Sequence, residues 1–137
     1  MMHYDITFKG YRRYCNKAGL PHYSGIYMVY VCTYNKTKKM VTLKKLIYIG
    51  QAEDLNRRIN NHEKDSDFLG QCKDGEQVCY AYAGVDKDDL DIVENALIFL
   101  QKPILNVELK DEYKYESAVF RIDGACSLLK LKEFSIE

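Results

Sequence analysis

Apolar positions in the first half of the chain fall into two short runs with the composition of β-strands. Residues 25–33 and 41–50 are rich in β-branched and aromatic side chains, which predicts two strands. The polar and basic stretch at residues 35–39 is typical of the tip of an antiparallel hairpin. The pattern therefore predicts that the two strands pair through a turn centred on Thr37 and Lys38.

The register of this hairpin decides which side chains meet. With the turn at that position, Tyr27 faces Tyr48 across the ladder, and both rings lie on one side of the sheet. A slip of one residue would move one ring to the opposite face. We therefore expect a pair of phenols on one surface of the hairpin.

Two helices and a third strand are expected after the hairpin. The acidic residues Glu53 and Asp54 favour a helix N-terminus, which predicts a helix running roughly to Lys64. Residues 77–85 have the composition of a third strand. A second helix is expected over residues 89–102, where a proline follows and prevents continuation.

Both expected helices carry charged residues on faces that should be buried. On the first helix a guanidinium and an imidazole share one stripe with two aliphatic residues, whereas Arg57 and Asn61 point elsewhere. On the second helix Glu94 lies among aliphatic neighbours, and a buried carboxylate requires a cation. The stripe consists of Leu55, Arg58, Ile59 and His62, and the neighbours of Glu94 are Leu90, Leu97 and Ile98.

The two ends of the chain have weaker patterns. Residues 117–122 and 128–136 suit two strands around the turn signal Asp123-Gly124, and they either extend the sheet or form an accessory hairpin. Near the N-terminus cationic and aromatic residues alternate, which suits phosphate contact with stacking and equally an ordinary helix with a solvated face. These residues are Lys9, Tyr11, Arg12, Arg13, Tyr14 and Lys17.

Composition narrows the class of protein. A length of 137 residues, of which 47% are hydrophobic, predicts one domain over residues 1–137 with an ordinary core. No apolar run is long enough to span a membrane, and the N-terminus lacks the pattern of a secretory signal, so we expect a cytoplasmic protein. The five cysteines include no C-x-x-C pair, which argues against a structural zinc site and a disulfide framework.

Charge is divided unevenly along the chain although the total is zero. Residues 1–62 hold eleven Lys or Arg against three acidic residues, and residues 63–137 hold nine against seventeen. Such polarity can present a basic surface to phosphates, and it also arises by chance on solvated faces.

Five sequence elements, taken in order, resemble those of the GIY-YIG nuclease superfamily. The resemblance spans residues 25–106 and implies an α+β fold, a small three-stranded antiparallel sheet flanked by helices, with a possible C-terminal β-hairpin. Residues 1–24 and 107–137 are then extensions of that core. The elements are Gly25-Ile26-Tyr27, Tyr48-Ile49-Gly50, Arg58-x-x-x-His62, Glu94 and Pro103-x-x-Asn106.

The same resemblance implies hydrolysis of DNA phosphodiester bonds by a water nucleophile. Tyr27 would be the general base, a phenol whose pKa of about 10 must be shifted by cations or whose proton must be handed on. Arg58 would bind an oxygen of the scissile phosphate, and His62 would take the proton of Tyr27. Tyr48 would orient the water or donate a hydrogen bond near the phosphate.

The expected cofactor is a divalent ion, Mg²⁺ or Mn²⁺, with Glu94 as its only protein ligand. Asn106 would fix a loop or contact the substrate. Lys36, Lys38 and Lys39 at the hairpin tip would contact double-stranded DNA, or form a solvated ribbon in which lysines protect an exposed edge. Cutting both strands normally needs two active sites, so a homodimer is possible.

Subgroup and alternatives depend on a few residues. The Arg-x-x-x-His spacing resembles the homing and restriction branches, and Gln51 stands where some repair-type members have Lys. Each site residue also has a purely structural explanation, such as a cross-strand pair of tyrosines or a salt bridge between Arg58 and Glu94. The alternative function is a catalytically inactive module that binds nucleic acid or protein. We favour a nuclease, because an inactive module has no reason to hold Arg58 and Glu94 on packing faces.

Overall fold

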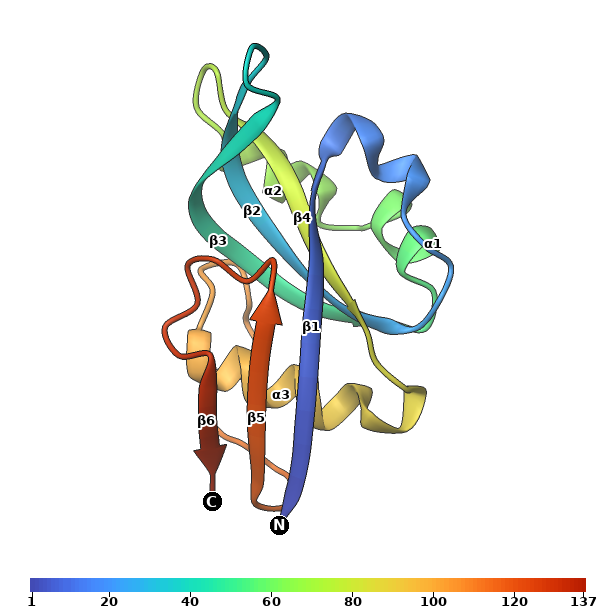
Figure 1. The fold of residues 1–137 in the computed structure, drawn as a ribbon, viewed down its shortest axis with the longest axis vertical. Helices are drawn as coiled ribbons and strands as arrows, with labels where there is room; N and C mark the ends of the chain where they lie inside the picture. Colours follow the sequence, from blue (N-terminus) through green and yellow to red (C-terminus); the bar gives the residue numbers. More distant parts are fainter.

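A curled six-stranded β-sheet is the centre of the protein in the computed structural model, which describes residues 1–137 (Figure 1). The strand order is β3-β2-β4-β1-β5-β6, and only the pair β1 and β5 is parallel. The strands are β1 (Met2–Arg13), β2 (Gly25–Asn35), β3 (Met40–Ala52), β4 (Gln77–Gly84), β5 (Ala118–Gly124) and β6 (Glu133–Ile136). The helices are α1 (Leu55–Asn60), α2 (Asp65–Gly70) and α3 (Leu90–Gln101), with the short 3₁₀ helices η1 (Tyr14–Gly19) and η2 (Lys87–Asp89).

The sheet is larger than expected. Strands β3, β2 and β4 form the expected antiparallel unit, but β1, β5 and β6 extend it, so the prediction of a three-stranded sheet is wrong. Strand β1 buries Ile6 and Phe8 while the residues between and beside them stay exposed, which is the alternation of a half-buried strand. The helical alternative for residues 9–17 is therefore wrong up to Arg13. The C-terminal strands pair with each other and extend the sheet.

Both faces of the central strands are buried, which explains the continuous apolar run in β2. Every residue from Gly25 to Cys32 is buried. Alternate side chains of this strand enter two different cores, with Met28 packing in a cluster that includes α3 and Tyr27 in a cluster that includes α1 and α2. The two cores lie on opposite faces of the sheet, and Figure 1 shows α3 crossing it well away from α1 and α2.

The hairpin register differs from the expected one near the tyrosines. At the tip Asn35 pairs with Met40, as a turn at Thr37 and Lys38 requires. Two register shifts then leave one extra residue each in β3, so that Tyr27 pairs with Gly50 and Val29 with Tyr48. Because two single-residue shifts restore the alternation, Tyr27 and Tyr48 lie diagonally on the same face instead of directly opposite.

The helices after the hairpin are shorter than predicted, apart from α3. Helix α1 begins where expected, because the Asp54 side chain accepts a hydrogen bond from the Arg57 backbone N–H at 3.0 Å. It ends at Asn60 instead of near Lys64, and a separate helix, α2, follows. Helix α3 ends before Pro103 as predicted, with Lys102 in the left-handed conformation. None of the helices has the length and apolar composition needed to span a membrane.

Candidate active site

The two motif glycines of the hairpin allow the close packing that positions Tyr27. A Cβ atom on Gly25 would lie 2.0 Å from the carbonyl oxygen of Ala83 on β4, so only glycine lets these strands approach. A Cβ atom on Gly50 would lie 2.4 Å from both Cζ and Oη of Tyr27. The Tyr27 ring therefore lies across the backbone of Gly50, and each glycine serves the position of that ring.

An aromatic cluster surrounds the hydroxyl of Tyr27, whose residue is only 1% exposed. The Tyr27 and Tyr48 rings are 6.2 Å apart between centroids, and the His62 ring meets both edge-on. Phe68 on α2 closes the cluster, 4.9 Å from His62 and 5.3 Å from Tyr48. The imidazole is thus held in an apolar environment at the Tyr27 hydroxyl, with Tyr27 Oη and His62 Nε2 2.7 Å apart.

The hydrogen bonds of His62 define which of its nitrogens carries the proton. The backbone N–H of Lys64 donates to Nδ1 at 3.1 Å, so Nδ1 is an acceptor. Burial, together with the nearby Arg58 charge, lowers the pKa of His62 to about 4, and the ring is neutral near pH 7. A neutral ring with an unprotonated Nδ1 carries its proton on Nε2. His62 therefore donates to Tyr27 Oη in this state.

Arg58 lies between the aromatic cluster and solvent and is bound by a carboxylate. Its Nη1 and Nη2 donate to the two carboxylate oxygens of Glu63 at 2.5 and 2.9 Å. This fork lowers the pKa of Glu63 to about 2 and raises the pKa of Arg58. Arg58 does not form the alternative salt bridge with Glu94. Glu63 occupies the two-oxygen site that a phosphate group would need on this guanidinium.

Glu94 extends from α3 to the other side of the tyrosines. Burial raises its pKa, and the hydrogen bond from Gln51 Nε2, 2.9 Å from Oε1, partly offsets that effect. The same Gln51 Nε2 is 2.7 Å from Asp91 Oδ1, which fixes the amide between two carboxylates. No cation of the protein pairs with Glu94 within 4 Å. The cation that the sequence requires for Glu94 is thus not supplied by another side chain.

Arg58 and Glu94 act electrostatically on the same phenols. Burial raises the pKa of both Tyr27 and Tyr48, Glu94 raises it further, and Arg58 lowers it. Beside them lies a cavity of about 350 Å³. Its lining includes Tyr48, Glu94 and Glu63, so a ligand in it would contact the carboxylate of α3 and the partner of Arg58 together.

Asn106 also borders this cavity, but its amide is engaged by the hairpin. Its Nδ2 donates to the Ile49 carbonyl at 2.9 Å, and its Oδ1 accepts from the Ile49 N–H at 3.0 Å. This pairing satisfies the free edge of β3 and anchors the segment after α3 to the second motif strand. Of the two expected roles, the loop-fixing one agrees with these contacts.

The structure brings together five of the residues singled out from sequence and separates three others. Tyr27, Tyr48, Arg58, His62 and Glu94 form one site, whereas the tip lysines Lys36, Lys38 and Lys39 lie at the far end of the hairpin. At about 3.3 Å per residue, Lys36 is up to about 30 Å along β2 from Tyr27. Sequence reasoning missed Glu63, Phe68 and the contact of Gln51 with Glu94. Glu63 and Phe68 lie beyond the end of α1, where helical spacing no longer applies.

A buried phenol, an imidazole, a guanidinium and a carboxylate around one cavity form a set of groups suited to hydrolysis of phosphate esters. The chain belongs to the GIY-YIG catalytic domain family, whose model matches residues 23–107, more than half of its length. This confirms the superfamily expected from the motifs, and membership indicates a nuclease-type function on nucleic acid. No curated protein and no solved structure matches the chain.

The donor set also fits the divalent ion typical of this family. No group of three or more His, Cys, Asp or Glu side chains forms a ready-made metal cage. Mg²⁺, however, commonly binds proteins through one or two carboxylates and completes its shell with waters and substrate phosphates. Glu94, a carboxylate without a cationic partner beside a cavity, meets that requirement.

Proposed function

We propose that the protein is a divalent-metal-dependent DNA endonuclease that uses water as the nucleophile. One observation carries the proposal. The hydroxyl of Tyr27 is buried 2.7 Å from the Nε2 of His62, in a site where both Arg58 and Glu94 act on the phenol. A structural tyrosine pair needs neither the imidazole nor the two ionic side chains.

In the proposed mechanism Tyr27 accepts the proton of the attacking water. It does so as a phenolate, which the Nε2–H donor of His62 and the positive charge of Arg58 both stabilise relative to the phenol. His62 thus assists Tyr27 as a hydrogen-bond donor, and does not take its proton as the motif alone suggested. Since burial raises the pKa of Tyr27, the ionised fraction is small near neutrality and grows with pH.

Arg58 binds the scissile phosphate after releasing Glu63. Its planar fork, now paired with two carboxylate oxygens, offers the same geometry to two phosphate oxygens. Tyr48 borders the cavity and positions the water or the phosphate. Asn106 keeps this part of β3 in place through Ile49.

Glu94 would hold Mg²⁺ or Mn²⁺. When bound, the ion stabilises the negative charge that develops on the phosphoryl and leaving oxygens. Gln51 keeps the Glu94 carboxylate oriented through its hydrogen bond.

Finer features of the function are also part of this proposal. We propose double-stranded DNA as the substrate and a relationship to homing and restriction members, supported by the contact of His62 with Tyr27 and by Gln51 in place of Lys. A cytoplasmic location is supported by five cysteines that are all unpaired. Cleavage of both strands would use two copies of the chain, as a homodimer.

Incubation of supercoiled plasmid with purified protein and Mn²⁺ or Mg²⁺ tests the proposal. Wild type is expected to nick or linearise the plasmid, and Glu94→Gln to lose cleavage while retaining DNA binding. Asp91→Asn is the matched control, because Asp91 shares the Gln51 amide but lies at the exposed surface. Arg58→Ala should be far more damaging than Arg57→Ala. Salt-sensitive DNA binding without cleavage under either metal would instead identify the inactive binding module.

A further inference from the structure

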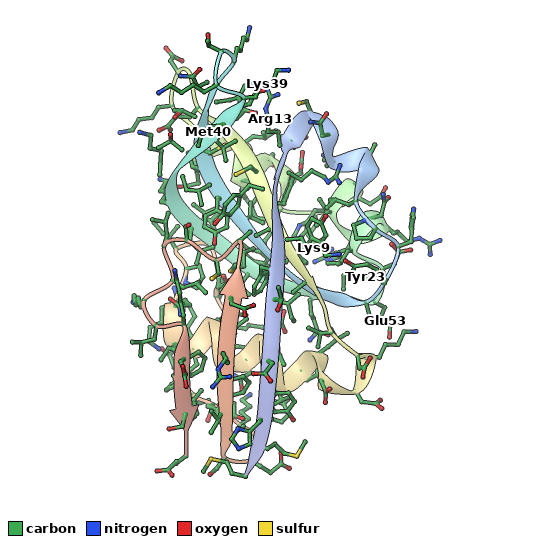
Figure 2. The ribbon with its side chains drawn as sticks, viewed as in Figure 1. Lys9, Arg13, Tyr23, Lys39, Met40 and Glu53 are labelled. Atoms are coloured by element: carbon green, nitrogen blue, oxygen red, sulfur yellow. The ribbon has the colours of Figure 1, made fainter.

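A second cavity lies at the other end of the sheet, where β1 approaches the hairpin tip. Its volume is about 560 Å³, larger than that of the cavity beside Glu94. It joins the end of β1, which lies outside the matched family region, to Tyr34 and Lys39 of the hairpin. Figure 2 shows Arg13 and Lys39 at this end of the molecule and Lys9 farther along β1.

Four cationic residues line this cavity, and no acidic residue does. None of the four has a carboxylate within 4 Å, although other cations of the protein do, such as Arg58, Lys17 and Arg121. Lining of one sign without compensation focuses a positive potential into the cavity. The four residues are Lys9, Arg12, Arg13 and Lys39.

Neutral groups hold the two arginines in place. The guanidinium of Arg13 stacks 3.6 Å above the Tyr34 ring centroid, and its Nε donates to Gln77 Oε1 at 2.9 Å. Arg12 donates from Nη1 to the Asn16 carbonyl, and its buried Nε has no hydrogen-bond partner in the protein. These contacts position the guanidinium groups but leave their charges free for an anionic ligand.

The spread of the cations favours a polymer over a small anion. Lys9 and Arg13 are four residues apart on β1, a span of up to about 13 Å at about 3.3 Å per residue. A single phosphate group cannot reach both, whereas one DNA strand carries a phosphate about every 3.4 Å along the helix axis. The register places the cavity near the catalytic site, because Lys9 pairs with Tyr82 and Tyr82 pairs with Tyr27.

We propose that this basic cavity binds the sugar–phosphate backbone of the DNA substrate away from the cleaved bond. The inference rests on the proposed action on DNA, and it assigns a function to residues that precede the catalytic domain. It also gives Lys39 a defined site, whereas Lys36 and Lys38 lie outside the lining.

Binding of a short DNA duplex in EDTA, measured against salt concentration, tests this site without any cleavage. The variant carries Lys9→Gln, Arg13→Gln and Lys39→Gln, and its matched control carries Lys73→Gln, Lys130→Gln and Lys132→Gln, three exposed lysines elsewhere. The slope of log K against log[salt] is expected to fall in magnitude by about 2 to 3 in the variant, with at least about tenfold weaker binding at low salt. The control should stay close to wild type.

Additional arms separate the outcomes. The double variant Lys9→Gln, Lys39→Gln changes only exposed side chains and should still lose about 1.8 of the slope, so a folding defect at Arg13 cannot mimic the result. An unchanged slope in both variants would overturn the proposal, as would ATP binding that the triple variant abolishes while DNA binding persists. A protein that binds through this cavity but never cleaves would refute the nuclease function alone.

Discussion

Replacing Glu63 by glutamine is expected to strengthen DNA binding, because it removes the carboxylate that occupies Arg58 in the free protein. The Glu63 side chain is 63% exposed and that of Arg58 33%, so their ion pair is screened by solvent. Exposed pairs contribute about 0.2–1 kcal/mol, and the two-pronged geometry places this one near about 1 kcal/mol. DNA must displace that contact before a phosphate can bind Arg58.

A second effect acts in the same direction. A phosphate on Arg58 would lie close to the Glu63 carboxylate, and two like charges about 4 Å apart in water repel by about 1 kcal/mol. Removing both effects corresponds to about 5- to 30-fold tighter binding at moderate salt. Fluorescence anisotropy with a labelled duplex in EDTA measures this change directly.

Two controls isolate the contact. Glu53→Gln makes the same charge change at an exposed site whose carboxylate does not contact Arg58, and it should tighten binding far less. In an Arg58→Ala background Glu63→Gln should lose its effect, which a double-mutant cycle quantifies. Equal tightening by Glu53→Gln and Glu63→Gln, or no coupling to Arg58, would refute the idea that Glu63 competes with phosphate.

Three further predictions follow from the aromatic cluster. Gly50→Ala should destabilise the protein by about 1–3 kcal/mol in urea unfolding and reduce cleavage, since its Cβ would overlap the Tyr27 ring. His62 has a folded-state pKa of about 4 against about 6.5 when unfolded, so the free energy of unfolding should decrease by at most about 3 kcal/mol from pH 7 to pH 4. His62→Asn should remove this part of the decrease, and an equally steep decrease in the variant would contradict the assignment. The cleavage rate should rise with pH from 7 to 9, because the pKa of Tyr27 is raised, and a rate that is flat over this range would exclude Tyr27 as the base.

The hairpin and its tyrosines are predictable because local pattern and motif agree there. Both strands are dense in β-branched and aromatic residues, and the face shared by Tyr27 and Tyr48 survives the register error, since the two shifts cancel. Strand β1 is not predictable in the same way. Its buried positions are confined to Ile6 and Phe8, and its partners lie far away in sequence on β4 and β5.

The identities of the catalytic residues are more predictable than their contacts. Helical spacing correctly separated Arg58 from Arg57, because Leu55 and Ile59 are buried on the same helix. The same spacing fails beyond Asn60, where the chain leaves the helix and a turn brings Glu63 onto Arg58. The tautomer of His62 depends on the backbone N–H of Lys64 in that turn, which no periodic pattern predicts.

The paired irregularities in β3 divide the hairpin into two parts that can vary separately. Between them and Ala52 the pairing is regular, and this part alone determines where Tyr27 and Gly50 meet. The distal part, with its basic tip, can be lengthened by two residues at a time without turning either phenol to the other face. Grafting of a different tip onto this hairpin is therefore a route to altered target preference with unchanged chemistry.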